Sequence, residues 1–402
     1  MRRLLAPLLR LYHRPVLLGR ENMPRKGPCF IIANHSGLYD PFFINYHLRE
    51  TPLAGIMTDE YLRAGIGAWF FRKLGVVATR KFQPQATPVR QLLRLVRDER
   101  MIVLMPEGES NWDGVTLPTV ASTGKLFRTA GVPVHPVILH NGYQAFPRWA
   151  TWPRPARVAV EFRPALEFTP EMSDGEVARL VDEAVQWHPD REPPELRWQG
   201  RWAFRPATGI TRLIFRCPHC AVASGLREQR GRYLHCRRCR SRWQVTADAA
   251  LVHLQSGDRQ STTAAFQAIC RMPREAIDFG QQGLALIRTP AIKVFRETEY
   301  PGYRYLGRYD CLLRNDRIDL IPVARGETIT LPLESLRSFS AELKVKLQLR
   351  TGTDLYQLRF DRGSSLQWQV YLKGLLPRLE TGLVRPTDYA HGHGLNREGA
   401  AA

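Results

Sequence analysis

The hydrophobic pattern changes along the chain, and its first half alternates short apolar runs with segments of helical period. Apolar runs of this length that are bounded by turn residues predict buried strands. The candidate strands are residues 29–33, 76–79, 101–105, 134–139 and 158–162, and the candidate helices include 88–98 and 175–186. This alternation favours an α/β fold built on a mostly parallel sheet with helices packed on it.

A second pattern begins near residue 281, where short segments of β character are separated by Gly, Asn, Asp or Pro. These segments are residues 284–288, 292–297, 309–314, 317–322, 327–332, 343–349 and 355–360. They predict an antiparallel sheet or a small barrel. Residues 364–379 predict one closing amphipathic helix, and strands followed by a helix resemble a pleckstrin-homology or GRAM-like module in layout.

Two cysteine pairs lie between these halves. Cys217 and Cys220 form the first pair, Cys236 and Cys239 form the second, and fifteen residues separate the pairs. The spacing is typical of a ribbon in which four thiolates bind Zn²⁺ tetrahedrally. Four protein ligands leave no open position on the metal, so we expect a structural zinc; redox chemistry of the C-x-x-C pairs is the alternative.

The chain has 402 residues, which is longer than a single domain with one hydrophobic core usually is, so several domains are expected. The changes of pattern place an α/β domain with an N-terminal amphipathic segment at residues 1–200 and a zinc ribbon at 208–255. A β-rich domain follows at 275–382, and residues 386–402, with their His, Gly and Ala, predict a disordered tail.

The charge of the chain points to an anionic partner. The formal net charge is +20, and residues 201–250 hold eleven arginines against two acids. A phospholipid surface, a nucleic acid or a phosphorylated substrate would each satisfy this charge. The apolar stretches are shorter than the roughly 20 residues of a membrane span, so we expect neither a transmembrane helix nor a signal peptide.

The opening residues predict contact with a membrane. Read as a helix, they place leucines on one face and arginines on another, which suits an anionic membrane surface. Because Pro7 opposes a longer helix, we expect the helix to start near Ala6 and to leave Leu4 and Leu5 in an extended arm. Packing of this segment on its own domain is the alternative interpretation.

An ionisable pair follows the first buried strand. His35 and Asp40 lie where the segment Ile31–Pro41 leaves this strand, at the edge where α/β folds place their chemistry. Across a turn the two side chains can reach hydrogen-bond distance. The carboxylate would then fix the imidazole tautomer and stabilise the imidazolium that forms when His35 takes a proton. A turn histidine beside a helix-capping aspartate is the structural alternative.

Four ordered motifs resemble the 1-acylglycerol-3-phosphate acyltransferase family over residues 15–165. Asn34-His35 with Asp40 is similar to the family's first block, and residues 74–80 are similar to the second. Pro106-Glu107-Gly108 matches the third block, and residues 132–137, preceded by Gly124-Lys125, match the fourth. The order and spacing of four blocks are more specific than any one of them.

The resemblance implies a fatty acyltransferase at the cytoplasmic face of a membrane, bound peripherally. It implies transfer from acyl-CoA or acyl carrier protein to a hydroxyl of a lysophospholipid such as 1-acylglycerol-3-phosphate, with His35 as general base and Asp40 orienting it. The resemblance also implies a set of substrate-binding residues: Arg80, Glu107, Gly108 and Lys125. Glu107 could equally have a structural role, in which its carboxylate holds the Gly108 turn in place.

The third block departs from the usual form of the family. Many relatives carry Thr-Arg after the Glu-Gly, whereas here Glu109 and Ser110 stand in those positions. Losing a cation beside a dianionic phosphate weakens its recognition. Either the acceptor is not 1-acylglycerol-3-phosphate, or Arg80 and Lys125 hold the phosphate alone.

Two further functions remain open from the sequence. The protein could be a lipid-binding adaptor whose catalysis is weakened by the altered third block. The arginine-rich ribbon could instead bind nucleic acid, with Tyr233 and Trp243 available for stacking. Nucleic acid is the less favoured partner, because a lipid surface or an acidic carrier protein fits an acyltransferase better.

Overall fold

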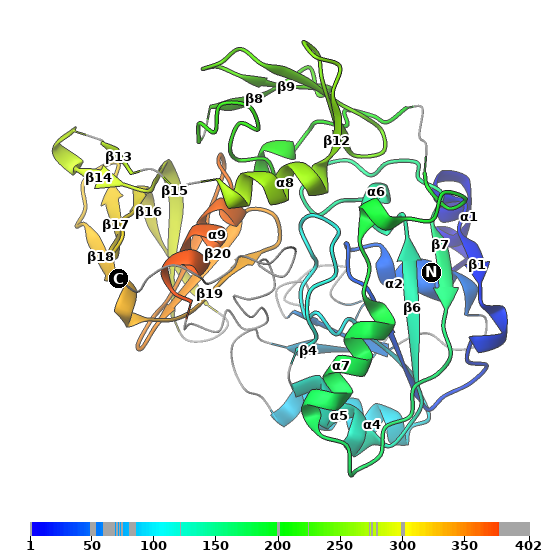
Figure 1. The fold of residues 1–402 in the computed structure, drawn as a ribbon. Helices are drawn as coiled ribbons and strands as arrows, with labels where there is room; N and C mark the ends of the chain where they lie inside the picture. Colours follow the sequence, from blue (N-terminus) through cyan, green and yellow to red (C-terminus); the bar gives the residue numbers. More distant parts are fainter. Residues whose placement is uncertain are drawn as a thin grey trace, which may run out of the picture.

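The computed structural model describes residues 2–48, 54–58, 69, 71, 73, 75–79, 86–120, 122–198, 202–223, 225–272, 274, 276–278, 280–298 and 302–377. These residues form three large sheets, which lie side by side with their helices, and one short two-stranded sheet (Figure 1). None of the helices in this part of the chain has the length and hydrophobicity that a membrane crossing requires.

The first sheet is mixed but mostly parallel, in the order β1-β7-β6-β2-β5-β3-β4. Only the β6–β7 pair is antiparallel. The strands of the first sheet are β1 (Val16–Leu18), β2 (Cys29–Ala33), β3 (Ala54–Thr58), β4 (Val76–Thr79), β5 (Met101–Leu104), β6 (Val134–His140) and β7 (Ala159–Phe162). The expected α/β fold with a mostly parallel sheet is confirmed.

Helices cover both faces of this sheet. They are α1 (Arg2–His13), α2 (Asp40–His47), α4 (Ala86–Arg97), α5 (Ser122–Ala130), α6 (Gly142–Ala145) and α7 (Asp174–Val185). All five residues of β2 are buried, and alternate side chains enter different cores. Ile31 packs with residues of α2, whereas Phe30 and Ile32 pack with residues of α4, α5 and α7. A strand buried on both faces reads as a continuous apolar run, which is why β2 was predictable.

The second sheet is antiparallel, in the order β12-β11-β10-β9-β8, and carries the paired cysteines. Its strands are β8 (Leu226–Gln229), β9 (Tyr233–Cys236), β10 (Arg242–Val245), β11 (Ala250–His253) and β12 (Arg259–Ser261), and α8 (Thr262–Arg271) follows directly. The side chain of Ser261 accepts a hydrogen bond from Ala264 N and so caps the start of α8.

The third sheet is also antiparallel, in the order β18-β17-β16-β15-β21-β20-β19. Its strands are β15 (Ile287–Glu297), β16 (Tyr303–Leu313), β17 (Arg317–Pro322), β18 (Ile329–Pro332), β19 (Leu336–Glu342), β20 (Lys346–Thr351) and β21 (Leu355–Arg359). A short hairpin of β13 (Ile277–Asp278) and β14 (Leu284–Ala285) precedes them, and α9 (Ser365–Leu375) closes the series. The expected β-rich region with a closing helix is confirmed.

The N-terminal helix begins earlier than the sequence predicted. Helix α1 starts at Arg2 and contains Pro7, so the expectation of an extended arm before Ala6 is wrong. Pro7 lies beyond the first turn of α1, where its missing N–H removes one intrahelical hydrogen bond without ending the helix. The other end of α1 is anchored, since Tyr12 Oη donates to Pro153 O at 3.0 Å and His13 O accepts Val158 N at 3.1 Å.

One hydrophobic core runs through parts of all three sheets. It joins Trp149 near the first sheet, Trp243 of the second and Trp368 of α9. Polar contacts cross the same boundaries. Tyr143 Oη lies 2.9 Å from Thr262 Oγ1 at the start of α8, and Ser364 Oγ donates to Arg212 O at 2.5 Å. The three large sheets therefore pack against one another through a shared core.

A buried acid at this junction predicts a pH-dependent stability. Burial raises the pKa of Asp113 from 3.8 to about 7, although hydrogen bonds to the carboxyl group oppose the rise. The folded state then holds this proton more tightly than the unfolded chain, so its stability falls as pH rises from about 4 to about 7. Asp113→Asn removes that loss and should stabilise the protein at pH 8 by on the order of 2 to 4 kcal/mol relative to its effect at pH 4.

Melting temperatures of the wild type and of Asp113→Asn at pH 4 and pH 8 test this expectation. Asp316→Asn is the matched control, because the Asp316 side chain is 68% exposed. An equal difference between Asp113→Asn and wild type at both pH values would show that Asp113 does not titrate in this range.

Candidate active site

Two neighbouring strands bring the first and third sequence motifs together. Strands β2 and β5 pair in parallel, with Ile32 opposite Leu104. Their carboxyl ends therefore meet at one edge of the sheet, where ligands bind in open α/β folds. The turn after β2 carries His35, and the turn after β5 carries Glu107 and Ser110.

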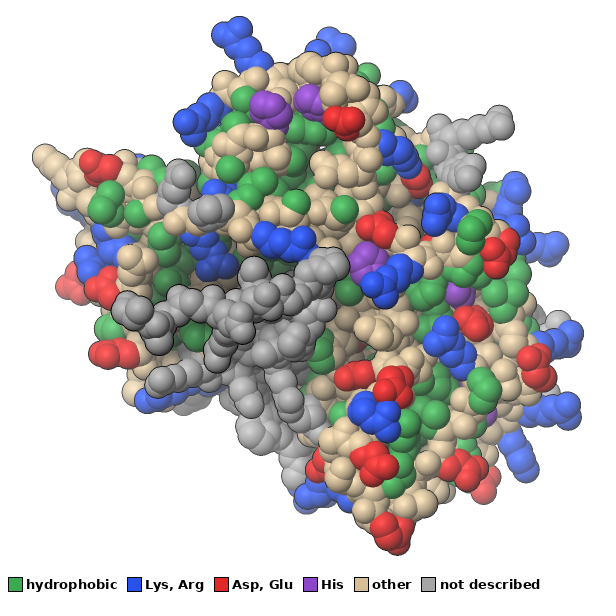
Figure 2. Space-filling view, viewed as in Figure 1, with side chains coloured by type: hydrophobic (Ala, Val, Ile, Leu, Met, Phe, Trp, Pro, Cys, Tyr) green, Lys and Arg blue, Asp and Glu red, His purple; other side chains and the backbone are tan. Residues whose placement is uncertain are grey.

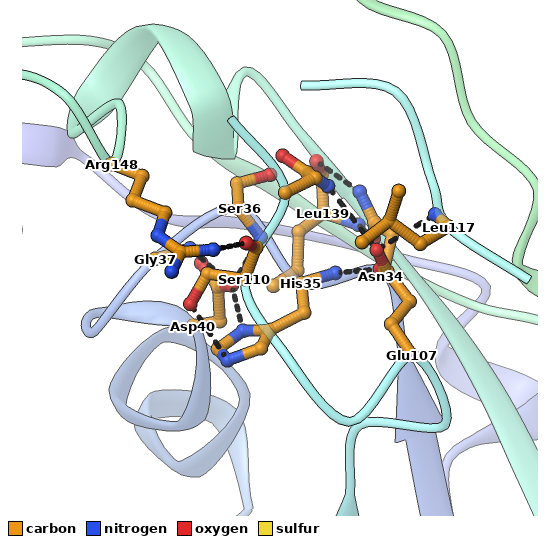
Figure 3. A network of polar contacts seen from close by, with 11 residues as sticks. Asn34, His35, Ser36, Gly37, Asp40, Glu107, Ser110, Leu117, Leu139 and Arg148 are labelled. Atoms are coloured by element: carbon orange, nitrogen blue, oxygen red, sulfur yellow. Dashed lines mark hydrogen bonds and ion pairs between the residues drawn. The ribbon is translucent and has the colours of Figure 1, made fainter. Parts of the chain in front are cut away.

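His35 and Asp40 form the expected pair (Figure 3). His35 Nδ1 lies 2.9 Å from Asp40 Oδ2. The same oxygen accepts the backbone N–H groups of Ser36 at 2.7 Å and Gly37 at 2.9 Å. These bonds fix the carboxylate at the first residue of α2, and the other imidazole nitrogen, Nε2, faces away from Asp40. The His35 side chain is 20% exposed and that of Asp40 is 2% exposed, so His35 is the member that can meet a substrate.

Glu107 is fully buried behind His35 and holds the two turns together. Its Oε1 accepts the His35 backbone N–H at 2.5 Å, and its Oε2 accepts Leu117 N at 2.8 Å. Burial raises the pKa of Glu107 well above its ordinary value, while the hydrogen bonds from Leu117 and His35 lower it. Of the two roles left open by the sequence, this geometry favours tying down the turn, because no part of the side chain is exposed.

Ser110 contacts the second nitrogen of the same imidazole. Its Oγ lies 3.1 Å from His35 Nε2, so Ser110, His35 and Asp40 form a continuous chain of hydrogen bonds. The backbone joins the two turns as well, since Asn111 N donates to His35 O at 2.9 Å. The arrangement of a hydroxyl, an imidazole and a carboxylate is the one that nucleophilic catalysis requires.

Arg148 approaches the Ser110 turn from the segment after α6 (Figure 3). Its Nη1 donates to Ser110 O and lies 3.5 Å from Glu109 Oε2. Its Nη2 and Nε donate to two carbonyl groups of the third sheet and its following turn, Ala341 O at 2.6 Å and Leu343 O at 3.1 Å. The guanidinium group also lies over the Trp112 ring at 4.3 Å. A buried cation therefore joins the third motif to the C-terminal sheet.

Three other residues were predicted to bind substrate, namely Gly108, Lys125 and Arg80, and the structure shows no side-chain contact between them and His35 in its described part. Gly108 is exposed at the turn, with a φ of 67° and its N–H bonded to Met105 O at 3.0 Å. Lys125 is exposed on α5, and in the described residues it makes no side-chain hydrogen bond or ion pair to the His35–Asp40 pair. Arg80 lies outside the described residues.

Sequence reasoning missed two features of the site. The sequence identified Ser110 only as a departure from the third motif and did not predict its contact with His35. Its position in that motif was the only signal that could have indicated a place in the site. Arg148 lies in no motif, and nothing in its local sequence predicted it. Only tertiary packing brings its guanidinium group to the turn.

The four paired cysteines are brought together as expected. The Sγ atoms of Cys217, Cys220, Cys236 and Cys239 all lie within 4.8 Å of one another. The Sγ–Sγ distance is 3.7 Å both for Cys217–Cys239 and for Cys220–Cys236. A tetrahedron with Zn–S bonds of about 2.3 Å has edges of about 3.8 Å, so the cluster can hold a metal ion of this kind.

Part of the chain that forms the first sheet is similar to known proteins. Residues 14–140 match the model of the family described as Acyltransferase. The chain is similar to 1-acyl-sn-glycerol-3-phosphate acyltransferase of Borreliella burgdorferi, with 26% identity over 128 residues. This match covers 31% of the chain and 51% of that relative, so the chain spans about half the length of the curated relative.

Two solved structures are also similar to parts of the chain. The 1-acyl-sn-glycerophosphate acyltransferase PlsC from Thermotoga maritima has 22% identity and a TM-score of 0.38, covering 46% of this chain and 78% of that one. The N-terminal PH domain of human ARAP2 has 8% identity and a TM-score of 0.18, covering 29% of this chain and 92% of that one. Both scores are too low to establish a common fold by superposition alone.

Proposed function

We propose, from the premise that residues 14–140 form an acyltransferase-family domain, that the protein transfers a fatty acyl group from a thioester to a hydroxyl of a lysophospholipid. The observation that carries this proposal is the contact of 2.9 Å between His35 Nδ1 and Asp40 Oδ2 at the carboxyl edge of β2. The donor is acyl-CoA or acyl carrier protein, and 1-acylglycerol-3-phosphate is the first acceptor to test.

The roles of the pair follow from its geometry. Asp40 keeps the proton of the imidazole on Nδ1, so Nε2 carries the lone pair that can accept a proton from an attacking hydroxyl. The imidazolium that results is stabilised by the buried carboxylate, which keeps two backbone N–H bonds throughout. The same proton then passes from Nε2 to the departing thiolate, which restores the neutral imidazole.

The acceptor is expected to differ in its head group from that of many relatives. The motif offers Glu109 and Ser110 where relatives carry Thr-Arg, and the nearby cation of Arg148 is already bonded to three carbonyl groups. A phosphate monoester would have to compete with these acceptors for the guanidinium N–H groups. A lysophospholipid with a diester or neutral head group therefore fits this turn better.

We assign membrane contact to α1 at the cytoplasmic face, as a peripheral association. Leu8 is 62% and Leu11 is 81% exposed on this helix. The C-terminal end of α1 is bonded to Pro153, and the next residue back, Trp152, is exposed and packs against the exposed ring of Phe204 at 5.3 Å. Exposed leucines with adjoining aromatic rings suit the interface between head groups and acyl chains.

The second sheet would contribute a structural zinc ion and an anion-binding surface. Zinc bound by four thiolates would stabilise the ribbon without entering the reaction. A pocket of about 580 Å³ on this sheet is lined by Gln229, Arg230, Tyr233, His235 and Arg242. Lys and Arg side chains are otherwise scattered over the visible face and do not gather in one patch (Figure 2). An acidic partner such as acyl carrier protein suits this pocket by charge.

We also propose limits for the three parts, although strand β12 of the second sheet lies beyond the ribbon limit. We assign residues 1–200 to the acyltransferase part, 208–255 to the zinc ribbon and 275–382 to the β-rich part. The β-rich part would serve docking, because the residues of the proposed reaction come from the first sheet.

An acyl-transfer assay tests the function. The purified protein is incubated with labelled acyl-CoA or acyl carrier protein and with vesicles that contain one lysophospholipid each, and the products are identified by mass. We expect one acceptor class to be acylated, and we expect His35→Ala to lower the rate by on the order of 10³-fold or more.

His135→Ala is the matched control, because among the described residues the His135 ring bonds the backbone oxygen of Asn22, at 3.0 Å, and not the His35–Asp40 pair. Equal rates for His35→Ala and wild type would remove the proposed mechanism. Binding of lysophospholipid without turnover by any donor would identify a lipid-binding protein instead.

A further inference from the structure

The segment after β5 fixes Ser110 at a defined place. Met105 to Gly108 form a tight turn that is closed by the Gly108 N–H to Met105 O bond of 3.0 Å, and Gly108 has a left-handed backbone. The backbone around Ser110 is held on both sides. The Ser110 carbonyl group accepts from Arg148, and the next N–H, of Asn111, donates to His35 O. A hydroxyl held in this way does not need to be ordered when a substrate arrives.

Ser110 occupies the position that an attacking hydroxyl needs. Its Oγ is 3.1 Å from His35 Nε2, the nitrogen that faces away from Asp40. In a one-step transfer the acceptor hydroxyl would first have to displace Ser110 from this nitrogen. In a two-step transfer, both hydroxyl groups would use Nε2 in turn, and nothing would have to be displaced.

The exposure of the three side chains follows the same order. Asp40 is buried, His35 is partly exposed and Ser110 is partly exposed, while Glu107 behind them is fully buried. Ser110 and His35 are therefore the two members of this hydrogen-bonded chain that a substrate can reach. In nucleophilic catalysis by serine, the base and its orienting carboxylate lie behind the nucleophile in this way.

We propose that Ser110 is the first acyl acceptor and that transfer proceeds through an acyl-serine intermediate. This inference rests on the proposed function, since it names the route by which the acyl group travels. Ser110 Oγ attacks the thioester carbonyl carbon as its proton passes to His35 Nε2. The C–S bond then breaks, and the thiolate takes the proton from His35. The acceptor hydroxyl next gives its proton to His35 and attacks the Ser110 ester, whose C–Oγ bond breaks as the proton returns to Oγ.

Arg148 acts as a positioning residue in this scheme. Its guanidinium group holds the carbonyl group of Ser110 and is itself held over Trp112 at 4.3 Å. Glu109, 3.5 Å from Nη1, balances the guanidinium charge.

Trapping the intermediate is the direct test. The full-length protein is mixed with acyl-CoA, and separately with a p-nitrophenyl ester of the same fatty acid, in the absence of any acceptor. We expect mass spectrometry to find one acyl group on the peptide that contains Ser110. The adduct should be absent from Ser110→Ala and from His35→Ala. In Ser110→Cys it should form as a thioester that neutral hydroxylamine cleaves, whereas the oxygen ester of the wild type resists that treatment.

Steady-state kinetics give the second readout. With donor and acceptor both varied, the wild type should give parallel double-reciprocal lines, and Ser110→Ala should lower kcat by on the order of 10³-fold or more. Ser256→Ala is the matched control, because Ser256 Oγ also lies near an imidazole nitrogen, 2.8 Å from His253 Nδ1, but in an exposed turn of the second sheet. We expect it to retain wild-type activity.

The outcomes separate this inference from the proposed function. A wild type that transfers acyl groups without forming an adduct, together with a Ser110→Ala variant at least as active, would overturn the acyl-serine route and leave the acyltransferase intact. An adduct at Ser110 that passes its acyl group only to water would support Ser110 and overturn transfer to a lysophospholipid. A wild type with neither adduct nor transfer would overturn both.

Discussion

An Asp40→Asn variant is expected to keep its fold and to lose about 10³- to 10⁴-fold of its acyl-transfer rate. The amide oxygen of Asn can replace Oδ2 as the acceptor for Ser36 N and Gly37 N, so the turn after β2 should survive. The amide lacks the negative charge that stabilises the imidazolium of His35. Its NH₂ group can also donate to His35 Nδ1, which favours the imidazole tautomer that carries its proton on Nε2 and cannot act as the base. The loss should therefore appear in kcat rather than in KM.

Rates over a range of acceptor concentrations and the melting temperature together check this expectation. Asp174→Asn is the control, because Asp174 is an exposed residue of α7 that pairs with Arg128. It should leave both quantities at the wild-type values. If Asp40→Asn retained a tenth or more of the activity, Asp40 would be a structural cap of α2 and not a partner of the base.

Removal of the metal is expected to have the largest effect on stability. Cys236→Ser should eliminate bound zinc and lower the melting temperature by about 10 °C or more, because a ribbon of this kind folds around its metal. The effect should extend beyond the ribbon. Leu234 and Trp243 of the second sheet belong to the same hydrophobic core as Trp149 and Trp368, so loosening the ribbon exposes apolar surface in all three parts.

Metal analysis and thermal unfolding of the full chain test this effect. Cys270→Ser is the matched control, since Cys270 lies on α8 outside the four-cysteine cluster. It should keep one zinc ion per chain and a melting temperature closer to that of the wild type. If Cys236→Ser kept the wild-type melting temperature, the cluster would not be a structural metal site.

The His–Asp pair could be predicted because both residues lie in one short segment. Ile31 and Ile32 mark a buried strand, and the turn to α2 follows at once, so local sequence determines that His35 and Asp40 meet. The cysteine cluster was predictable for the same reason, since each pair is local and the distance between the pairs is typical of a zinc ribbon.

The C-terminal sheet shows why strand limits were less predictable. Residues 284–288 and 292–297 were expected to be separate strands because a turn residue, Pro290, lies between them. Strand β15 contains the whole second segment and the last two residues of the first, Ile287 and Arg288, and its register with β16 shifts between Thr289 and Ile292. A bulge and a turn use similar residues, and only pairing with a neighbouring strand distinguishes them. Strand β19, with its Arg and Ser residues, carries no clear hydrophobic alternation and was missed.

The contacts of Arg148 could not be predicted, because they depend on residues far apart in the sequence. Two of its acceptors, Ala341 O and Leu343 O, lie 193 and 195 positions away. Neither belongs to a motif, and a backbone carbonyl group leaves no trace in a sequence pattern. Residues that act through tertiary contacts of this kind can be found only from the three-dimensional structure.

The same contacts bear on which piece of the chain is self-sufficient. The family-like segment ends at residue 140, but the turn that carries Ser110 is completed by Arg148 and, through it, by carbonyl groups beyond residue 340. Truncation after the first sheet would strip the guanidinium group of two acceptors and uncover one side of the cation that rests on Trp112. The segment that matches the family model is thus smaller than the unit that must fold for this turn to be complete.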